Sequence, residues 1–280
     1  MTTAAPVLAR PSLGERLSMV VGDSLTIAKR NVIKIRRVPD VLIFSTLSPI
    51  MFVLLFAYVI GAAIDVPGGY REEFLIAGIF AQTVVFGATF TGAGLAEDMQ
   101  KGIIDRFRSL PMASSAVLAG RTISDVAINV VSLTVMSLTG LVVGWWIRGS
   151  LLDVVLAYVL LLLFAYAVSW IMAVVGLLVQ TPEVFNNASF MVIFPLTFIA
   201  NTFVPIDRLP TVLRVIAEWN PVSALAQATR ELFGNTSPLA PTPDAWSLQH
   251  PVATSLIWVV VILVVFVPLA LRQYKKTVSR

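Results

Sequence analysis

Long runs of uncharged, mostly apolar residues alternate with short charged segments along the whole chain. Six runs contain no Asp, Glu, Lys or Arg, and each exceeds the roughly 20 residues with which a helix crosses the hydrocarbon of a membrane. Helices are expected here because a segment in lipid must satisfy its own backbone hydrogen bonds, and barrel strands would be shorter and alternating. The runs cover residues 41–64, 74–96, 126–147, 154–182, 184–206 and 245–271.

This pattern predicts an all-α membrane protein with six transmembrane helices in one domain, residues 41–271. Residues 1–40 precede it as a cytoplasmic lead-in, in which basic and apolar positions over 13–37 predict an amphipathic helix lying on the inner leaflet. Residues 272–280 form a basic cytoplasmic tail. The spans are expected near residues 41–60, 74–95, 123–147, 154–178, 184–204 and 252–271.

Composition and charge agree with a membrane protein. Of the 280 residues, 57% are hydrophobic and 13% are charged, against roughly 25% charged in an ordinary soluble domain. The chain has no cysteine and a single histidine, His250, which excludes disulfides, thiolate metal sites and a histidine metal cluster. No metal site or cofactor is therefore expected in this chain.

Basic residues are concentrated on one side of the predicted membrane. Segments 1–40, 97–125 and 272–280 hold seven, four and four Lys or Arg residues, whereas 65–73, 148–153 and 207–244 hold one, one and three. Cytoplasmic loops carry the excess of basic residues, so the first set and both termini are predicted to be cytoplasmic. The net charge of +4 then indicates contact with anionic membrane lipid rather than nucleic acid.

A charged segment at residues 97–111 separates the second and third runs. Its charges exclude it from hydrocarbon, so it lies in water against the membrane. On a helix, its apolar positions form one stripe and leave a charged face for a partner, until Pro111 ends the helix. The apolar positions are Met99, Ile103, Phe107 and Leu110, and the charged ones are Glu97, Asp98, Lys101, Asp105, Arg106 and Arg108.

Several of these charges are spaced to form ion pairs along a helix. Lys101 lies three residues from Asp98 and four from Asp105, and Arg121 lies four from Asp125. The carboxylates nearest the runs, Asp125 and Asp153, are expected at the ends of spans. With no ionisable residue expected inside a span, a proton- or sodium-coupled transporter is disfavoured.

The fifth run and the segment after it are unusually polar. Asn186, Asn187 and Asn201 are predicted either to line a cavity or to bridge neighbouring helices. Residues 211–219 and 222–233 predict two short amphipathic helices that cap or dip into the outer leaflet, because their charges forbid a crossing. The residues that frame this external re-entrant segment are Pro205, Pro210, Asn220 and Pro221.

Motifs of nucleotide hydrolysis, zinc proteases and serine hydrolases are absent from the sequence. Residues 97–111 with 113–121 instead resemble the cytoplasmic loop of ABC-2 type exporter permeases, and are especially similar to the daunorubicin-resistance type of actinobacterial membrane subunit. Residues 204–210, followed by Asn220 and Pro221, match a second hallmark of that family. Many of these permeases have a Glu-rich first loop, and the variant at residues 105–108 favours the drug-resistance subgroup over polysaccharide exporters.

The resemblance implies a six-helix permease that is not an enzyme. It combines with a second permease copy or a homologue, and with two separate nucleotide-binding ATPase subunits that hold ATP and magnesium. The family's coupling helix, which enters a cleft on the ATPase, matches residues 97–110, and turn 180–183 matches a second cytoplasmic contact. The residues assigned to ATPase coupling are Glu97, Asp98, Lys101, Gly102, Asp105, Arg106, Phe107, Arg108, Leu110 and Pro111.

The expected function is ATP-driven export of a hydrophobic or amphipathic compound, such as an antibiotic or a lipid, across a bacterial plasma membrane. Nucleotide binding on the partner would move the coupling segment and tilt spans one, two and five, so that a cavity changes its access. An ion-coupled secondary drug transporter is the alternative function, and a membrane scaffold that transports nothing is a second.

Overall fold

The computed structural model describes residues 22, 26, 39–60, 71–103, 114–206, 209–239 and 242–278. Within these ranges every regular element is a helix, which confirms the all-α prediction. The amphipathic helix predicted over residues 13–37 lies outside the described residues, apart from Gly22 and Thr26.

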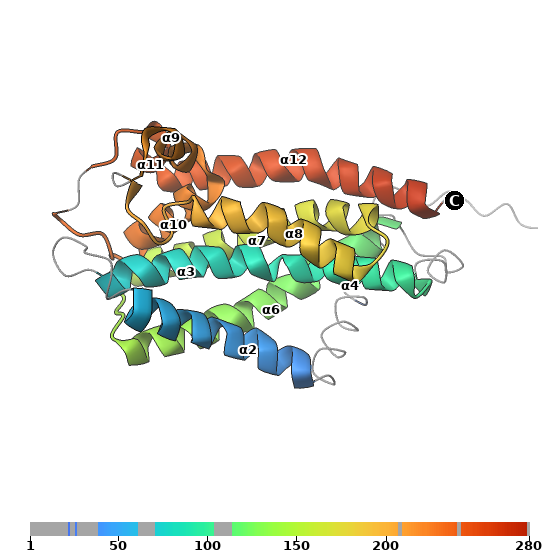
Figure 1. Cartoon of the computed structure of the whole chain (residues 1–280), viewed down its shortest axis with the longest axis horizontal. Coiled ribbons are helices and arrows are strands. Elements are labelled where there is room, and N and C mark those ends of the chain that lie inside the picture. Colours follow the sequence, from blue (N-terminus) through green and yellow to red (C-terminus); the bar gives the residue numbers. More distant parts are fainter. Residues whose placement is uncertain are drawn as a thin grey trace, which may run out of the picture.

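The helices follow one another with short connections. Figure 1 shows α3, α8 and α12 running along the long axis of the molecule, with α9, α10 and α11 gathered at one end and the C-terminus at the other. The elements are α2 (Pro39–Leu54), the π-helix η1 (Leu55–Ile60), α3 (Arg71–Gly87), α4 (Thr89–Gln100), α6 (Ser114–Val143), α7 (Leu151–Leu178), α8 (Pro182–Phe198), α9 (Thr211–Trp219), α10 (Pro221–Leu232), α11 (Trp246–Gln249) and α12 (Pro251–Val278).

Four described helices are long and apolar enough to cross a membrane, and they correspond to predicted spans two, three, four and six. They are Glu72–Gln100, Leu118–Val143, Leu151–Leu178 and Pro251–Thr277. The other two predicted spans coincide with shorter helices, α2 with η1 and α8, which contain Pro49 and Pro195. At about 1.5 Å per residue, the 17 residues of α8 rise about 25 Å, slightly less than the roughly 30 Å of hydrocarbon.

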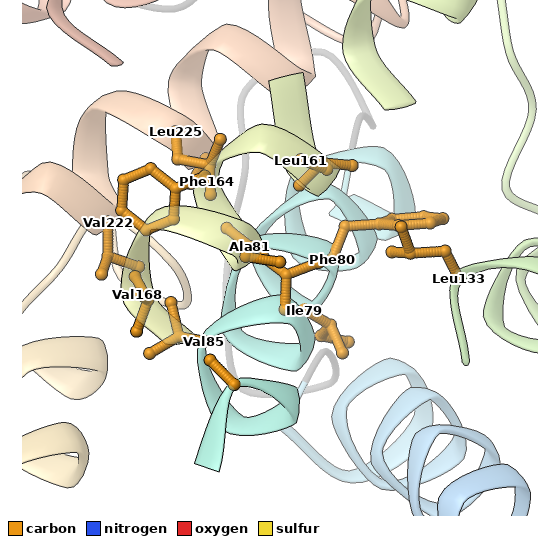
Figure 2. Close-up of a cluster of buried hydrophobic side chains, with 14 of the residues drawn as sticks. Ile79, Phe80, Ala81, Val85, Leu133, Leu161, Phe164, Val168, Val222 and Leu225 are labelled. Atoms are coloured by element: carbon orange, nitrogen blue, oxygen red, sulfur yellow. The ribbon is translucent and has the colours of Figure 1, made fainter. Parts of the chain in front are cut away.

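The continuous pair α3–α4 occupies the centre of the bundle. In its most apolar stretch 67% of residues are buried inside the protein, against 22% for α12. Lipid tails suit apolar side chains as well as a protein core does, so packing and polar contacts decide which helix lies inside. Figure 2 shows the central cluster, in which Ile79, Phe80 and Val85 of α3 meet Leu133 of α6, Leu161, Phe164 and Val168 of α7, and Val222 and Leu225 of α10.

Helices α4 and α7 touch backbone to backbone at two glycines. A Cβ atom on Gly176 would lie 2.5 Å from the carbonyl oxygen of Gly92 and 2.7 Å from its Cα atom. Small residues allow this close approach, which strengthens van der Waals contact between helices in lipid. The two helices are therefore closely packed at this point.

The two amphipathic helices predicted after the fifth span are confirmed as α9 and α10. Asn220 caps α10, because its side-chain oxygen accepts from the Val222 N–H at 2.8 Å and its amide donates to the Leu196 carbonyl at 2.7 Å. Pro221 takes the first helical position. The apolar face of α9 points away from the rest of the protein: Val212, Val215, Ile216 and Trp219 are exposed.

Arg230 of α10 connects α9 and α10 to the long helices of the bundle. Its guanidinium donates to the carbonyls of Asn201 at 2.6 Å, Thr202 at 3.2 Å and Phe74 at 3.1 Å. It also lies 3.7 Å from the centre of the Phe74 ring. The side chain is 2% exposed, so these carbonyls and the ring replace the water that a buried cation needs.

Substituting Gly176→Ala should destabilise the bundle by about 1–3 kcal/mol, because the added methyl group overlaps the α4 backbone. Gly22→Ala is the matched control, since a Cβ atom on Gly22 meets nothing within 4 Å. The midpoint of thermal unfolding in detergent measures both variants. A Gly176→Ala midpoint equal to that of Gly22→Ala would contradict the backbone contact.

Candidate coupling seam and transmembrane pocket

Polar and small residues follow the line along which α3–α4 meets α6. On each helix they are three or four positions apart, which places them on one face. Because the two helices are antiparallel, their positions meet in order from the end of α4 toward α3. We name this line the coupling seam; it comprises Gly87, Thr91, Gly94 and Asp98 on α3–α4, and Arg121, Asp125 and Asn129 on α6.

An ion pair between Asp98 and Arg121 lies at the end of the seam nearest the C-terminus of α4. Arg121 Nη1 is 3.2 Å from Asp98 Oδ2, and the two side chains are 16% and 8% exposed. A Cβ atom on Gly94 would collide with the Arg121 guanidinium. The glycine therefore makes room for the arginine against α4, and the pair joins the end of span two to the start of span three.

Asp125, which the sequence places at the end of a span, is buried in the bundle. Its side chain is 4% exposed, and helix α6 begins eleven residues before it, at Ser114. The Thr91 hydroxyl donates to its carboxylate, and the Asn129 amide donates to its backbone carbonyl at 2.9 Å. The predicted ion pair with Arg121 is replaced by these contacts, because Arg121 binds Asp98 on the facing helix.

The charged segment begins on the end of span two, not on a separate helix. Helix α4 ends at Gln100, and Gly102 has a φ of +63°, a left-handed conformation that glycine adopts without strain. The prediction of one continuous helical stripe from Met99 to Leu110 is wrong for this reason. Asp105, Arg106, Phe107, Arg108, Leu110 and Pro111 lie outside the described residues.

Lys101 pairs with Glu97 and not with Asp98. The hydrogen bond to Glu97 and the charge of that carboxylate raise the pKa of Lys101. Asp98 is instead turned inward toward α6. In this turn, the Glu97–Lys101 pair thus faces water, and the Asp98–Arg121 pair lies inside the protein.

A pocket of about 220 Å³ lies between α2, α3, α4 and α6, beyond the inner end of the seam. Gln82 is its most unusual lining residue, because the side chain is 2% exposed and neither amide atom has a hydrogen-bond partner among the described residues. Sequence analysis missed Gln82, although an amide inside an uncharged span was the available signal. The pocket is lined by Ser48, Pro49, Phe52, Gln82, Thr83, Phe86, Gly87, Thr89, Phe90 and Ser132.

The three asparagines predicted to line a cavity do not reach this pocket. Asn186 and Asn187 are exposed on α8. Asn201 is buried, and it bridges to α10 through its N–H to the Ser223 hydroxyl at 2.8 Å and its amide to Gln227 at 3.3 Å. Asn201 therefore bridges neighbouring helices, which is one of the two roles predicted for it.

A model of the ABC-2 type transporter family matches residues 24–233. The chain belongs to the ABC-2 type transporter family. It is 34% identical over 266 residues to the daunorubicin resistance ABC transporter permease protein DrrB1 of Streptomyces coeruleorubidus, a match that covers 94% of this chain and 90% of the relative. It is 21% identical over 222 residues to the putative transport permease ycf38 of Cyanophora paradoxa, covering 78% of this chain and 76% of that protein.

This ABC-2 permease is a multi-pass membrane protein and a subunit of an exporter. The resemblance noted from residues 97–111 and 204–210 is confirmed. An ABC-2 membrane subunit is not itself an enzyme, because ATP is hydrolysed on a separate nucleotide-binding subunit, which is therefore a partner of this chain.

Removing one charge of the Asp98–Arg121 pair should destabilise the permease by about 3–5 kcal/mol, because the remaining charge stays buried without its partner. Asp98→Asn and Arg121→Met are the single variants. The double variant Asp98→Asn/Arg121→Met should recover most of the loss, since it leaves no unpaired charge.

Thermal unfolding in detergent measures this double-mutant cycle. Lys101→Met is the control, because it breaks the exposed pair with Glu97 and should leave the midpoint close to that of the unaltered chain. Additive losses in the double variant would show that Asp98 and Arg121 do not interact.

Proposed function

We propose that this permease exports a hydrophobic or amphipathic compound, such as an antibiotic or a lipid, from a bacterial cell. The observation that carries the proposal is its similarity over nearly its whole length to a permease named for daunorubicin resistance. A pocket among the helices, to which three phenylalanines contribute, is consistent with such cargo.

The proposed topology has six spans, with α2–η1 and α8 crossing beside the four long helices and both termini in the cytoplasm. Figure 1 supports this arrangement, since the end of α4 and the end of α12 lie at one end of the bundle, opposite α9, α10 and α11. The basic residues are concentrated in the segments that this topology makes cytoplasmic.

Residues 97–111 are proposed to dock on the ATPase and to couple its cycle to the spans. Force applied to this segment acts directly on α4, whose last turn carries Glu97 and Asp98. The ion pair with Arg121 then passes the displacement to α6. Because α4 and α6 both line the pocket, a shift along the coupling seam changes its shape.

A second permease copy, or a homologue, is proposed to cover part of α8. Asn186 and Asn187 are exposed amides next to the strongly apolar part of this helix. Uncharged polar side chains facing lipid are unfavourable, and in membrane proteins they commonly face another helix or a water-filled cavity. These two residues are therefore proposed to line a space between two permeases.

Reversing both charges with Asp105→Lys/Arg106→Glu should abolish ATP-dependent export, because the segment no longer fits its ATPase cleft. The variant should still insert into the membrane, since both residues lie in water. Daunorubicin accumulation in liposomes that contain the permease and its ATPase measures the loss, with Lys275→Glu in the C-terminal tail as control. Normal export by the double variant would contradict the coupling role.

The same liposomes test the ion-coupled alternative, which the buried Asp125 carboxylate makes worth measuring. Transport that follows an imposed proton or sodium gradient without ATPase would favour this alternative. Transport that needs the ATPase and ATP, and proceeds without any gradient, would support the proposed function.

Lys101→Cys should react with a membrane-impermeant maleimide only from the cytoplasmic side. The chain contains no cysteine, so the introduced thiol is the single site of labelling. Leu239→Cys, in the exposed loop after α10, should react only from outside. Labelling of Lys101→Cys in intact cells would overturn the topology.

A further inference from the structure

We propose that the pocket around Gln82, here called the Gln82 pocket, binds the exported compound through a planar aromatic portion that carries carbonyl or hydroxyl groups. The inference rests on the proposed export function and adds to it a binding site and a ligand chemistry. It is carried by an unsatisfied buried amide, by the aromatic lining and by the absence of charge among the lining residues.

The Gln82 amide is the first reason. A buried amide without a hydrogen-bond partner is unfavourable, and such groups are few in native structures. A leucine at this position of α3 would fill similar space without that penalty. Neither polar atom of the side chain finds a partner among the described residues, so the amide is available to donate to, and accept from, a bound molecule.

The aromatic lining is the second reason. Phe52 of α2, Phe86 of α3 and Phe90 of α4 contribute three rings to one small pocket. Aromatic rings pair favourably with other aromatic groups in stacked or edge-on arrangements. A flat ring system inserted here therefore gains contacts that a saturated chain of equal size does not.

Hydroxyl groups add further hydrogen-bonding capacity. Thr83 lines the pocket and donates its hydroxyl to the Met136 sulfur at 3.3 Å. A thioether is a weak acceptor, so a ligand carbonyl competes well for this donor. Ser48, on the exposed side of α2, supplies another hydroxyl at the lipid-facing side of the pocket.

Charge and size define the rest of the ligand class. None of the described residues that line the pocket is Asp, Glu, Lys or Arg, so the inserted portion is uncharged. The pocket volume of about 220 Å³ is below the roughly 300–1,000 Å³ typical for drug-sized ligands. It is therefore large enough for a small ring system, while any larger or charged portion of the ligand remains outside.

The test uses the full-length permease in lipid nanodiscs and 1,4-dihydroxyanthraquinone as the probe, measured by its change in fluorescence. Gln82→Leu should weaken binding at least tenfold, and its thermal midpoint should stay equal or rise, because an unsatisfied amide is removed. Gln249→Leu removes an exposed amide at the end of α11, which does not line the pocket, and should bind like the unaltered chain. Ser48→Trp fills the outer side of the pocket and should also weaken binding.

Anthracene is the matched ligand control, because it has the same three-ring shape and no hydrogen-bonding group. Gln82→Leu should bind anthracene as well as, or better than, the unaltered chain. Equal affinity of Gln82→Leu and the unaltered chain for the anthraquinone overturns the proposal, and so does the absence of saturable binding to the unaltered chain. A lower midpoint in Gln82→Leu, with normal binding by Ser48→Trp, also overturns it, since the amide would then be structural.

Export measured with the ATPase present separates this proposal from the function on which it rests. If Gln82→Leu leaves ATP-dependent export unchanged, the proposed binding site is wrong and the proposed function stands. Binding that depends on Gln82, in a permease that exports nothing with its ATPase and ATP, removes the proposed function and keeps the site.

Discussion

The buried ion pair between Asp98 and Arg121 holds the end of α4 against the start of α6. A charge inside a membrane bundle needs an opposite charge or several dipoles, and Arg121 finds its partner on the neighbouring helix. This requirement determines how far α4 extends beside α6. It also explains Gly94, since any side chain there would exclude the guanidinium.

At the opposite end of the bundle, a buried cation is stabilised in a different way. Arg230 takes three backbone carbonyls and the face of Phe74; no carboxylate pairs with it in the described part of the chain. A buried arginine thus joins helices at each end of the bundle. The Gln82 pocket lies between the two arginines, where α3 continues into α4. A displacement of α4 would therefore change the shape of the pocket.

Local features of the backbone, such as the point where a helix is interrupted, were predicted well, whereas the partners of charged side chains were not. Asn220 and Pro221 interrupt a helix through their own backbone chemistry, so α9 and α10 follow from the sequence. Asp125 was expected at the end of a span because the uncharged run begins directly after it, at residue 126. In fact α6 starts at Ser114, which moves Asp125 into the bundle.

The sequence by itself determined the helical class, the long apolar spans, the external amphipathic pair and the family, because each depends on local composition, spacing or motif. Only the tertiary structure decided which polar groups meet. Asp98 pairs with Arg121, which is 23 residues away, and not with nearby Lys101. In the tertiary structure, the Gln82 amide has no hydrogen-bond partner among the described residues. Partner choice depends on helix packing, and packing brings together positions that no local spacing relates.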